Sequence, residues 1–348
     1  VSFDEKPPIL TVEQALAADT RFGPPVIWAK GDAAAAIAAA PRQIAGEMAV
    51  GGQEHFYLEG QVAAAIPQDG GEMLVLSSTQ HPTEIQHKVA HALHVPMHAV
   101  RVVCRRMGGG FGGKESQGNH LAIACALVAQ ITGRPARMRY DRDDDMTITG
   151  KRHDFHYDYE VGFDDDGRVL ALRIEMIARA GFSTDLSGPV ATRAVCHVDN
   201  AYYLSDVDIR ALLARTNTQS NTAFRGFGGP QGAIAIEHVL DSIARHLGRD
   251  PLDVRKLNAY GGAGRDTTPY GQVVADNVIL ELVAELEADS DYRARRSAIA
   301  AFNATSPVLK KGLALTPVKF GISFNLSHLN QAGALVHVYT DGSVQVNH

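Results

Sequence analysis

The sequence is poor in cysteine, and the cysteines that it has are far apart. Only three occur in 348 residues, at Cys104, Cys125 and Cys196. An odd count without a Cys-x-x-Cys pair fits neither a disulfide framework nor a zinc site. We therefore expect the protein to work in a reducing cytoplasm.

Two further absences exclude other classes of protein. No apolar run approaches the roughly 20 residues needed to cross a membrane, and the first residues lack the basic region and apolar stretch of a secretory signal. The formal net charge is −6, from 33 Lys and Arg against 39 Asp and Glu, whereas nucleic-acid-binding domains usually carry a basic surface. We expect neither a membrane nor a nucleic acid as partner.

Histidine is plentiful, with 15 residues, but its spacing does not indicate a metal site. No His-Glu-x-x-His motif occurs. His87 and His91 are four residues apart in an expected helix, but no third ligand is evident. We interpret these two, together with His55, His81 and His197, as solvated or core side chains.

Hydrophobic spacing predicts both helices and strands, without a regular βαβ alternation. Helices are expected over 31–40, 83–94, 117–132, 232–247, 250–259 and 274–303, and strands over 99–104, 155–163 and 168–179. The helix over 117–132 is apolar nearly all round, which predicts burial, and Gly133 ends it. Thr83 and Gln86 are spaced as a capping box. We expect an α+β (mixed α/β) fold.

The two ends of the chain look like cuts in a longer protein. There is no initiator methionine, and residues 333–348 alternate apolar and polar residues around Asp341-Gly342, which predicts a hairpin at the very end. We expect three parts. Residues 1–30 form the tail of a preceding domain and a linker, residues 31–265 a first domain, and residues 266–348 the start of a second domain.

Three stretches are rich in glycine, at 51–56, 106–115 and 220–232. Residues 108–113 match the dinucleotide pattern by letter, but the acidic residue expected about 20 positions later would fall inside a helix. A phosphate-binding P-loop fails at Glu115, where Ser or Thr would hold magnesium. A nucleotide site and a simple tight turn stay open as alternatives. Glycine also lets a ligand approach the backbone, and the aromatic and cationic residues of 220–232 suit a flat, polar ligand.

Together these stretches resemble the molybdopterin-binding subunit of the xanthine dehydrogenase and aldehyde oxidase family. The matching segments are 51–59, 106–115 and 221–232, with further likeness at 141–150 and 330–335. The resemblance runs from about residue 5 to the end, and the chain looks like a fragment of a bacterial-type member of the family. It implies a molybdenum–molybdopterin cofactor whose metal no protein side chain ligates, with FAD and [2Fe-2S] clusters in partner domains or a partner subunit. Residues 31–265 and 266–348 would then be the first molybdopterin-binding domain and the start of the second.

The resemblance also implies residues that hold the cofactor. Gln53 matches the glutamine whose amide contacts a molybdenum oxygen, and Phe111 and Gly112 match the backbone that lies against the cofactor. Arg225 matches an arginine that contacts it from the second glycine loop. From the residues alone, Gln53 could equally be a surface glutamine, and Arg225 a donor that pins its own loop.

Three positions bear on the substrate within this family. Xanthine dehydrogenases carry Glu, Arg and Phe where this chain has Glu115, Arg193 and Phe227, whereas aldehyde oxidases typically lose the Glu/Arg pair. The resemblance therefore implies hydroxylation of hypoxanthine and xanthine to uric acid, with water as the oxygen source. Arg193 would offset charge on the purine, Glu115 would exchange protons with it and Phe227 would stack on it. Without the family, Glu115 could cap a helix and Arg193 could be a surface cation.

The remaining parts of the family's site are expected beyond His348. These are the glutamate that serves as general base, further cofactor loops and a second aromatic wall, so this chain alone is expected to be inactive. The complete enzyme is expected to be a dimer whose substrates are purines.

Two alternative functions stay open. One is an aldehyde or N-heterocycle oxidase of the same family, and the other is a cofactor-free domain of the same fold that binds a partner. The final electron acceptor, NAD or oxygen, also stays open, as does the question whether the enzyme is one polypeptide or several subunits.

Overall fold

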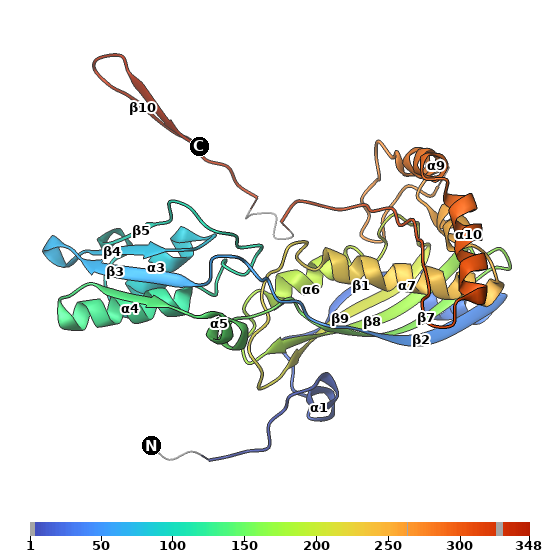
Figure 1. The fold of residues 1–348 in the computed structure, drawn as a ribbon, viewed down its shortest axis with the longest axis horizontal. Helices are drawn as coiled ribbons and strands as arrows, with labels where there is room; N and C mark the ends of the chain where they lie inside the picture. Colours follow the sequence, from blue (N-terminus) through green and yellow to red (C-terminus); the bar gives the residue numbers. More distant parts are fainter. Residues whose placement is uncertain (1–3, 263, 325–329) are drawn as a thin grey trace.

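Two β-sheets and the helices packed against them build the body of the chain (Figure 1). The structure is a computed structural model and describes residues 4–262, 264–324 and 330–348. One sheet has five strands in the order β1-β9-β8-β7-β2, and the other has four in the order β5-β4-β3-β6. The mixed α/β fold class is confirmed.

The five-stranded sheet carries the larger hydrophobic core. Its strands are β1 (Val26–Lys30), β2 (Arg42–Val50), β7 (Phe155–Phe163), β8 (Val169–Gly181) and β9 (Asp206–Arg215). Neighbouring strands are antiparallel except for β8 and β9. Alternate residues such as Phe155 and Tyr157 are buried, and they pack in one cluster with residues of α6 (Ser187–Val195) and α7 (Gly229–Leu247). The expected hairpin of two long strands is therefore confirmed as β7 and β8.

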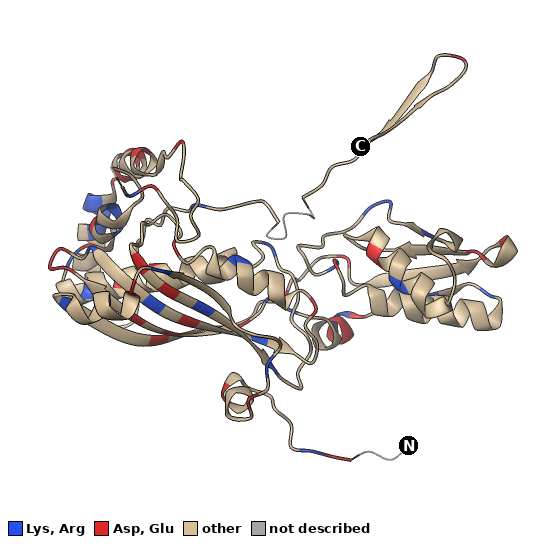
Figure 2. Cartoon of the chain, turned by 180° about the vertical axis from the view of Figure 1, so that it is seen from behind, with Lys and Arg blue, Asp and Glu red and all other residues tan. Residues whose placement is uncertain are grey.

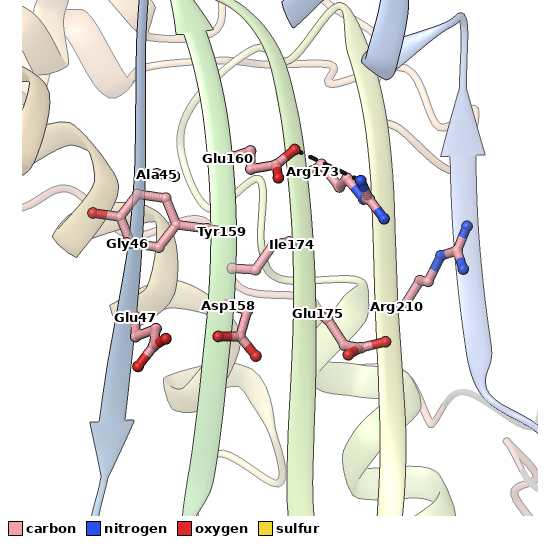
Figure 3. Close-up of a pocket in the computed structure, with 10 residues that line it drawn as sticks. All are labelled: Ala45, Gly46, Glu47, Asp158, Tyr159, Glu160, Arg173, Ile174, Glu175 and Arg210. Carbon is pink, nitrogen blue, oxygen red and sulfur yellow. Dashed lines mark ion pairs between the residues drawn. The ribbon is translucent and has the colours of Figure 1, made fainter.

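The opposite face of this sheet is charged. The short helices α1 (Val12–Ala17) and α2 (Ala33–Ala39) pack against parts of it, and acidic and basic residues lie on the strands between (Figure 2). Figure 3 shows Glu47, Asp158 and Glu175 on neighbouring strands beside Arg210, around a hollow of about 490 Å³. None of the residues proposed from the sequence as site residues lines it.

The four-stranded sheet consists of β3 (Val62–Pro67), β4 (Met73–Ser77), β5 (Val100–Val103) and β6 (Ala136–Arg139). Helices α3 (Pro82–Leu93) and α4 (Asn119–Thr132) pack against it and share its core. The predicted capping box of α3 is wrong, because His81 is the N-cap residue and Pro82 opens the helix. The Gln86 amide instead donates to the carbonyls of Met97 and Val100.

Helix α4 ends at Gly133, which has a φ of +65°, as the sequence predicts. Its expected burial all round is wrong, because Val128 and Ile131 are 51% and 80% exposed. The helix is buried along one face only, through residues such as Leu121 and Cys125.

Helix α5 (Arg142–Ile148) lies between β6 and β7 in the sequence. The elements after α7 are α8 (Pro251–Asn258), α9 (Ile279–Asp289), α10 (Tyr292–Thr305), β10 (Leu335–Val338) and β11 (Val344–Asn347). The single helix expected over 274–303 is wrong, because the chain breaks at Asp291, whose φ is +48°. The predicted hairpin is confirmed as β10 and β11, which pair around Asp341-Gly342. In the described part of the chain, no helix is long and apolar enough to cross a membrane.

Candidate functional site

The two main glycine loops lie against each other, although they are more than 100 residues apart in the sequence. The backbone N–H of Arg225 donates to the carbonyl of Phe111 at 2.8 Å. Gly112 has a φ of +98°, and a Cβ there would lie 2.7 Å from the carbonyl oxygen of Ala223. Only glycine permits both this conformation and this approach, so the loop contact explains the glycine.

A pocket of about 320 Å³ opens where these loops meet, a size at the lower end of the roughly 300–1,000 Å³ typical of small-molecule sites. Its lining consists of Gln80, Phe111, Gly112, Glu115, Arg193, Ala223, Phe224, Arg225, Phe227 and Phe324. Six of the seven residues proposed from the sequence are among them. The structure therefore brings the proposed cofactor and substrate residues to one place, with the exception of Gln53.

Arg193 is a buried cation without a counter-ion. It lies in the last turn of α6 and is 5% exposed. Its two terminal nitrogens donate to the carbonyls of Gly321 and Ser323, and its Nε has no partner among the described residues. No carboxylate in the described part of the chain forms an ion pair with it, and burial lowers the pKa of its guanidinium. Burying an uncompensated charge is costly, so this position favours an electron-rich ligand in the pocket.

Close packing of α6 and α7 brings Phe227 to Arg193. Gly228, with a φ of +99°, precedes α7, and a Cβ at this position would lie 2.0 Å from the carbonyl oxygen of Val190 in α6. The Phe227 ring consequently lies with its centroid 5.9 Å from the Arg193 guanidinium. The second glycine loop thus positions an aromatic face beside the buried cation.

Glu115 is the acidic residue of the pocket. Burial raises the pKa of its carboxyl, and the nearby carboxylate of Asp185 raises it further. The protonated form is therefore more populated near neutral pH than in an exposed glutamate. Such a side chain can donate as well as accept a hydrogen bond, which suits a ligand that changes its tautomer.

A second aromatic side chain faces Phe227 across the pocket. The rings of Phe227 and Phe324 have centroids 5.9 Å apart, at an interplanar angle of 42°. Phe324 thus adds an aromatic side chain to the pocket, and the second aromatic wall expected beyond His348 stays a prediction. The sequence reasoning missed Phe324 because no local pattern links the segment around it to the glycine loops.

Gln53 is not among the residues that line this pocket, and its expected contact with the cofactor stays a prediction. Its side-chain oxygen accepts a hydrogen bond from Arg152 Nε at 2.7 Å. The same guanidinium donates to the carbonyl of Arg225 at 3.0 Å and stacks over the Phe224 ring at 3.8 Å. Gln53 therefore helps to hold Arg152 in contact with the second glycine loop.

Gln80 lines the pocket, although it was not expected there from the sequence. It follows β4, and its side-chain oxygen accepts hydrogen bonds from the N–H groups of Gly112 at 2.8 Å and Lys114 at 3.2 Å. Sequence reasoning missed it because the Ser-Ser-Thr-Gln stretch at 77–80 has no glycine to draw attention. The signal that could have indicated it is the run of polar residues at 77–80, where the apolar strand β4 ends.

A buried ion pair fixes both ends of the first glycine loop. Lys114 is fully buried, and its Nζ donates to the Glu59 carbonyl at 2.7 Å, to Ser78 Oγ at 2.9 Å and to Glu59 Oε2 at 3.3 Å. Glu59 Oε2 also accepts from the N–H of Gly108 at 2.6 Å. The P-loop alternative is therefore wrong, because this lysine points into the protein and does not face a ligand.

The histidines fit the interpretation as core and solvated side chains. His55 and His197 are buried. His55 Nε2 lies 2.7 Å from the carbonyl oxygen of Ala223, and its ring stacks on Phe224 at 4.5 Å. Among the described residues, no group of three or more His, Cys, Asp or Glu side chains could hold a metal ion.

Comparison with known proteins places the chain among molybdopterin-binding proteins. Residues 19–259 match one molybdopterin cofactor-binding domain profile, and residues 285–348 match a second. The xanthine dehydrogenase of Drosophila subobscura is 47% identical over 99% of this chain, and the xanthine dehydrogenase/oxidase of Felis catus is 43% identical over all of it. In both cases the chain spans 26% of the length of the relative.

Solved structures give the same fold. The aldehyde oxidoreductase of Desulfovibrio gigas superposes with a TM-score of 0.79 and 24% identity, over 99% of this chain and 38% of its own. The quinoline 2-oxidoreductase of Pseudomonas putida 86 gives a TM-score of 0.77 at 24% identity, over 87% of this chain and 40% of its own. At this identity the likeness concerns the fold alone.

Proposed function

The chain belongs to the family of molybdopterin cofactor-binding domains and is similar to xanthine dehydrogenases. From this premise we propose that it forms part of the substrate-oxidising centre of a xanthine dehydrogenase. The substrates of the enzyme would be hypoxanthine and xanthine. One observation carries the proposal. The pocket between the glycine loops combines a buried arginine without a counter-ion among the described residues, a glutamate of raised pKa, and the facing rings of Phe227 and Phe324.

The walls of the pocket fit a molybdopterin cofactor. Phe111 and Gly112 both line the pocket, and any side chain at position 112 would collide with the second loop. The Arg225 side chain is exposed there and has no hydrogen-bond or ion-pair partner in the described part of the chain. We assign cofactor binding to Phe111, Gly112 and Arg225, and to Gln80 in place of Gln53. The bound cofactor would supply the redox chemistry that places an oxygen atom from water on the purine.

Arg193 would stabilise negative charge on the purine. Its guanidinium already lies in a site shielded from water, so it need not be desolvated during the reaction. The Arg193 side chain also lines the pocket, where its positive charge would face a carbonyl oxygen of the purine. A donor of this kind contributes roughly 3 kcal/mol when the charge develops mainly in the transition state.

Glu115 would bind the polar edge of the purine. Because its raised pKa populates the protonated form, it can donate to a ring nitrogen or a carbonyl oxygen and accept from an N–H. A small aldehyde offers few of these groups. The pair Glu115 and Arg193 would therefore select purines over aldehydes, while Phe227 stacks on the purine plane.

The parts of the enzyme that receive the electrons lie outside this chain. Its relatives are about four times as long as the match, and we propose that iron–sulfur and FAD domains, in the same polypeptide or a partner subunit, complete the enzyme as a dimer. We place the first molybdopterin-binding domain at 31–265 and the start of the second at 266–348. The three cysteines are free, which supports a cytoplasmic location.

Purification of the full-length protein tests this proposal. We expect bound molybdenum and turnover of xanthine that exceeds turnover of an aromatic aldehyde. A protein that contains molybdenum and prefers the aldehyde would identify an aldehyde or N-heterocycle oxidase instead. A folded protein without molybdenum, after expression in a host that makes the cofactor, would indicate a domain without a cofactor.

A further inference from the structure

The four-stranded sheet has one covered face and one open face. Met73, Val75 and Ala65 point to the side where α3 and α4 complete the core. On the other side the strands line a groove of about 890 Å³. Its lining consists of Glu59, Val62, Ala63, Ala64, Leu74, Leu76, Ser77, Ser78, Arg101, Val103, Cys104, Arg105, Arg106 and Arg137. This groove is separate from the pocket between the glycine loops.

The strand register gives this open face an apolar centre. Val103, Leu76, Ala64 and Arg137 are direct neighbours across β5, β4, β3 and β6. Leu74 lies beside Arg101 in the next row. The two inner strands therefore present aliphatic side chains, and Leu76 is 41% exposed.

Arginines flank this centre on both edges. Arg101 lies on edge strand β5, Arg105 and Arg106 follow that strand, and Arg137 lies on edge strand β6. Within the described part of the chain, none of these four side chains forms an ion pair or a hydrogen bond. The one carboxylate in the lining, Glu59, is already engaged by Lys114, Ser78 and Gly108. The groove thus holds four positive charges without acceptors.

An apolar centre with arginines around it is the composition of a protein–protein interface. A membrane surface suits this face poorly, because the apolar residues line a hollow and do not protrude. A nucleic acid would leave the aliphatic centre without a partner. A second copy packed face to face about a twofold axis would bring both sets of arginines around one apolar centre.

We propose that this open face binds another domain of the longer protein, through a surface whose apolar residues are flanked by Asp and Glu. The relatives carry about three quarters of their length outside the region that matches this chain, which provides such a domain. Its carboxylates would pair with Arg101, Arg105, Arg106 and Arg137, and its apolar residues would cover Leu74 and Leu76. Arginine forms two parallel hydrogen bonds with a carboxylate, so these pairs would also fix the orientation of the domain.

Site-specific cross-linking in the full-length protein tests the proposal. A photo-cross-linking amino acid replaces Leu76, and the matched control replaces Ile131, which is exposed on the outer side of α4. We expect position 76, and not position 131, to cross-link to an acidic and apolar segment outside residues 1–348. Cross-links confined to residues 1–348, cross-links between two copies at position 76, or no cross-link at position 76 would each overturn the proposal.

Charge reversal tests the arginines themselves. In the protein labelled at position 76, Arg101→Glu with Arg137→Glu should lower the cross-link yield by about tenfold, because each pair becomes repulsive. Arg134→Glu serves as the control, since Arg134 is exposed and lies outside the groove. High salt should lower the yield in the unsubstituted protein as well. A yield that neither charge reversal nor salt changes would contradict the role of the arginines, and binding to phosphatidylserine vesicles that the double variant loses would favour a membrane.

Discussion

Acid should destabilise this fold through His153, a buried side chain that contacts the start of α6. The side chain is 1% exposed, its Nε2 is 2.7 Å from Ser187 Oγ at the start of α6, and its Nδ1 has no hydrogen-bond partner. Burial lowers the pKa of His153 to about 4. A histidine in an unfolded chain titrates near pH 6.5. As the pH falls, the unfolded state therefore binds its proton first, and stability that is fully present above pH 6.5 is lost down to about pH 4.

The size of this effect follows from the difference between the two pKa values. About 2.5 pKa units, at about 1.4 kcal/mol for each, correspond to roughly 3.5 kcal/mol in total. His197 contributes in the same pH window, because burial also lowers its pKa to about 4. A comparison of the wild type with His153→Gln isolates the share of one residue.

Urea unfolding at two pH values measures that share. Trp28, the only tryptophan, packs against the core of the five-stranded sheet and reports unfolding by its fluorescence. Between about pH 7.5 and about pH 5, the wild type should lose about 2 kcal/mol more of its free energy of unfolding than His153→Gln does. Equal losses in both proteins would refute the reasoning, because His153 would then not titrate differently in the folded and unfolded states.

Three further substitutions have defined outcomes. Gly228→Ala should lower the free energy of unfolding by about 1–3 kcal/mol, because residue 228 has a φ of +99° and the new Cβ would collide with a carbonyl of α6. Thermal unfolding measures this loss, and an unchanged midpoint would contradict it. Lys114→Met should lower the free energy of unfolding, measured with urea, by about 2–3 kcal/mol, because Glu59 loses its buried partner. The Glu59 carboxylate stays partly exposed, which limits the loss. An unchanged free energy of unfolding would contradict the role of the ion pair. In the full-length enzyme, Gln80→Ala should reduce the turnover number for xanthine more than Gln53→Ala does, and the opposite order in steady-state kinetics would return the cofactor contact to Gln53.

Much of the fold could be predicted from local patterns. The β7–β8 hairpin follows from alternation around Asp164–Gly167, and the end of α4 follows from Gly133, because both features are encoded within a few neighbouring residues. Strands such as β2 and β9 could not be predicted, since their pairing involves strands more than 30 residues away in the sequence. The break between α9 and α10 was also missed. Asp291 adopts a left-handed conformation there, which few side chains favour.

The residues of the candidate site also fall into those that the sequence indicates and those that it does not. Phe111, Gly112, Arg225 and Phe227 stand in glycine-rich stretches that attract attention in the sequence, and the structure brings them together. Gln80 and Phe324 stand in ordinary stretches, and only the tertiary fold places them in the pocket.

The kinetics of two variants of the full-length enzyme, Arg193→Met and Glu115→Ala, test the central claim most directly. With xanthine, Arg193→Met should lower the turnover number by roughly 10²–10³-fold and affect binding less, because the charge that it offsets develops in the transition state. Glu115→Ala should weaken both binding and turnover of xanthine. A small aldehyde, which lacks the second carbonyl and the ring nitrogens, should lose little with either change. Equal losses on both substrates would contradict the account, because the two residues would then support the fold or the cofactor and would not select the purine.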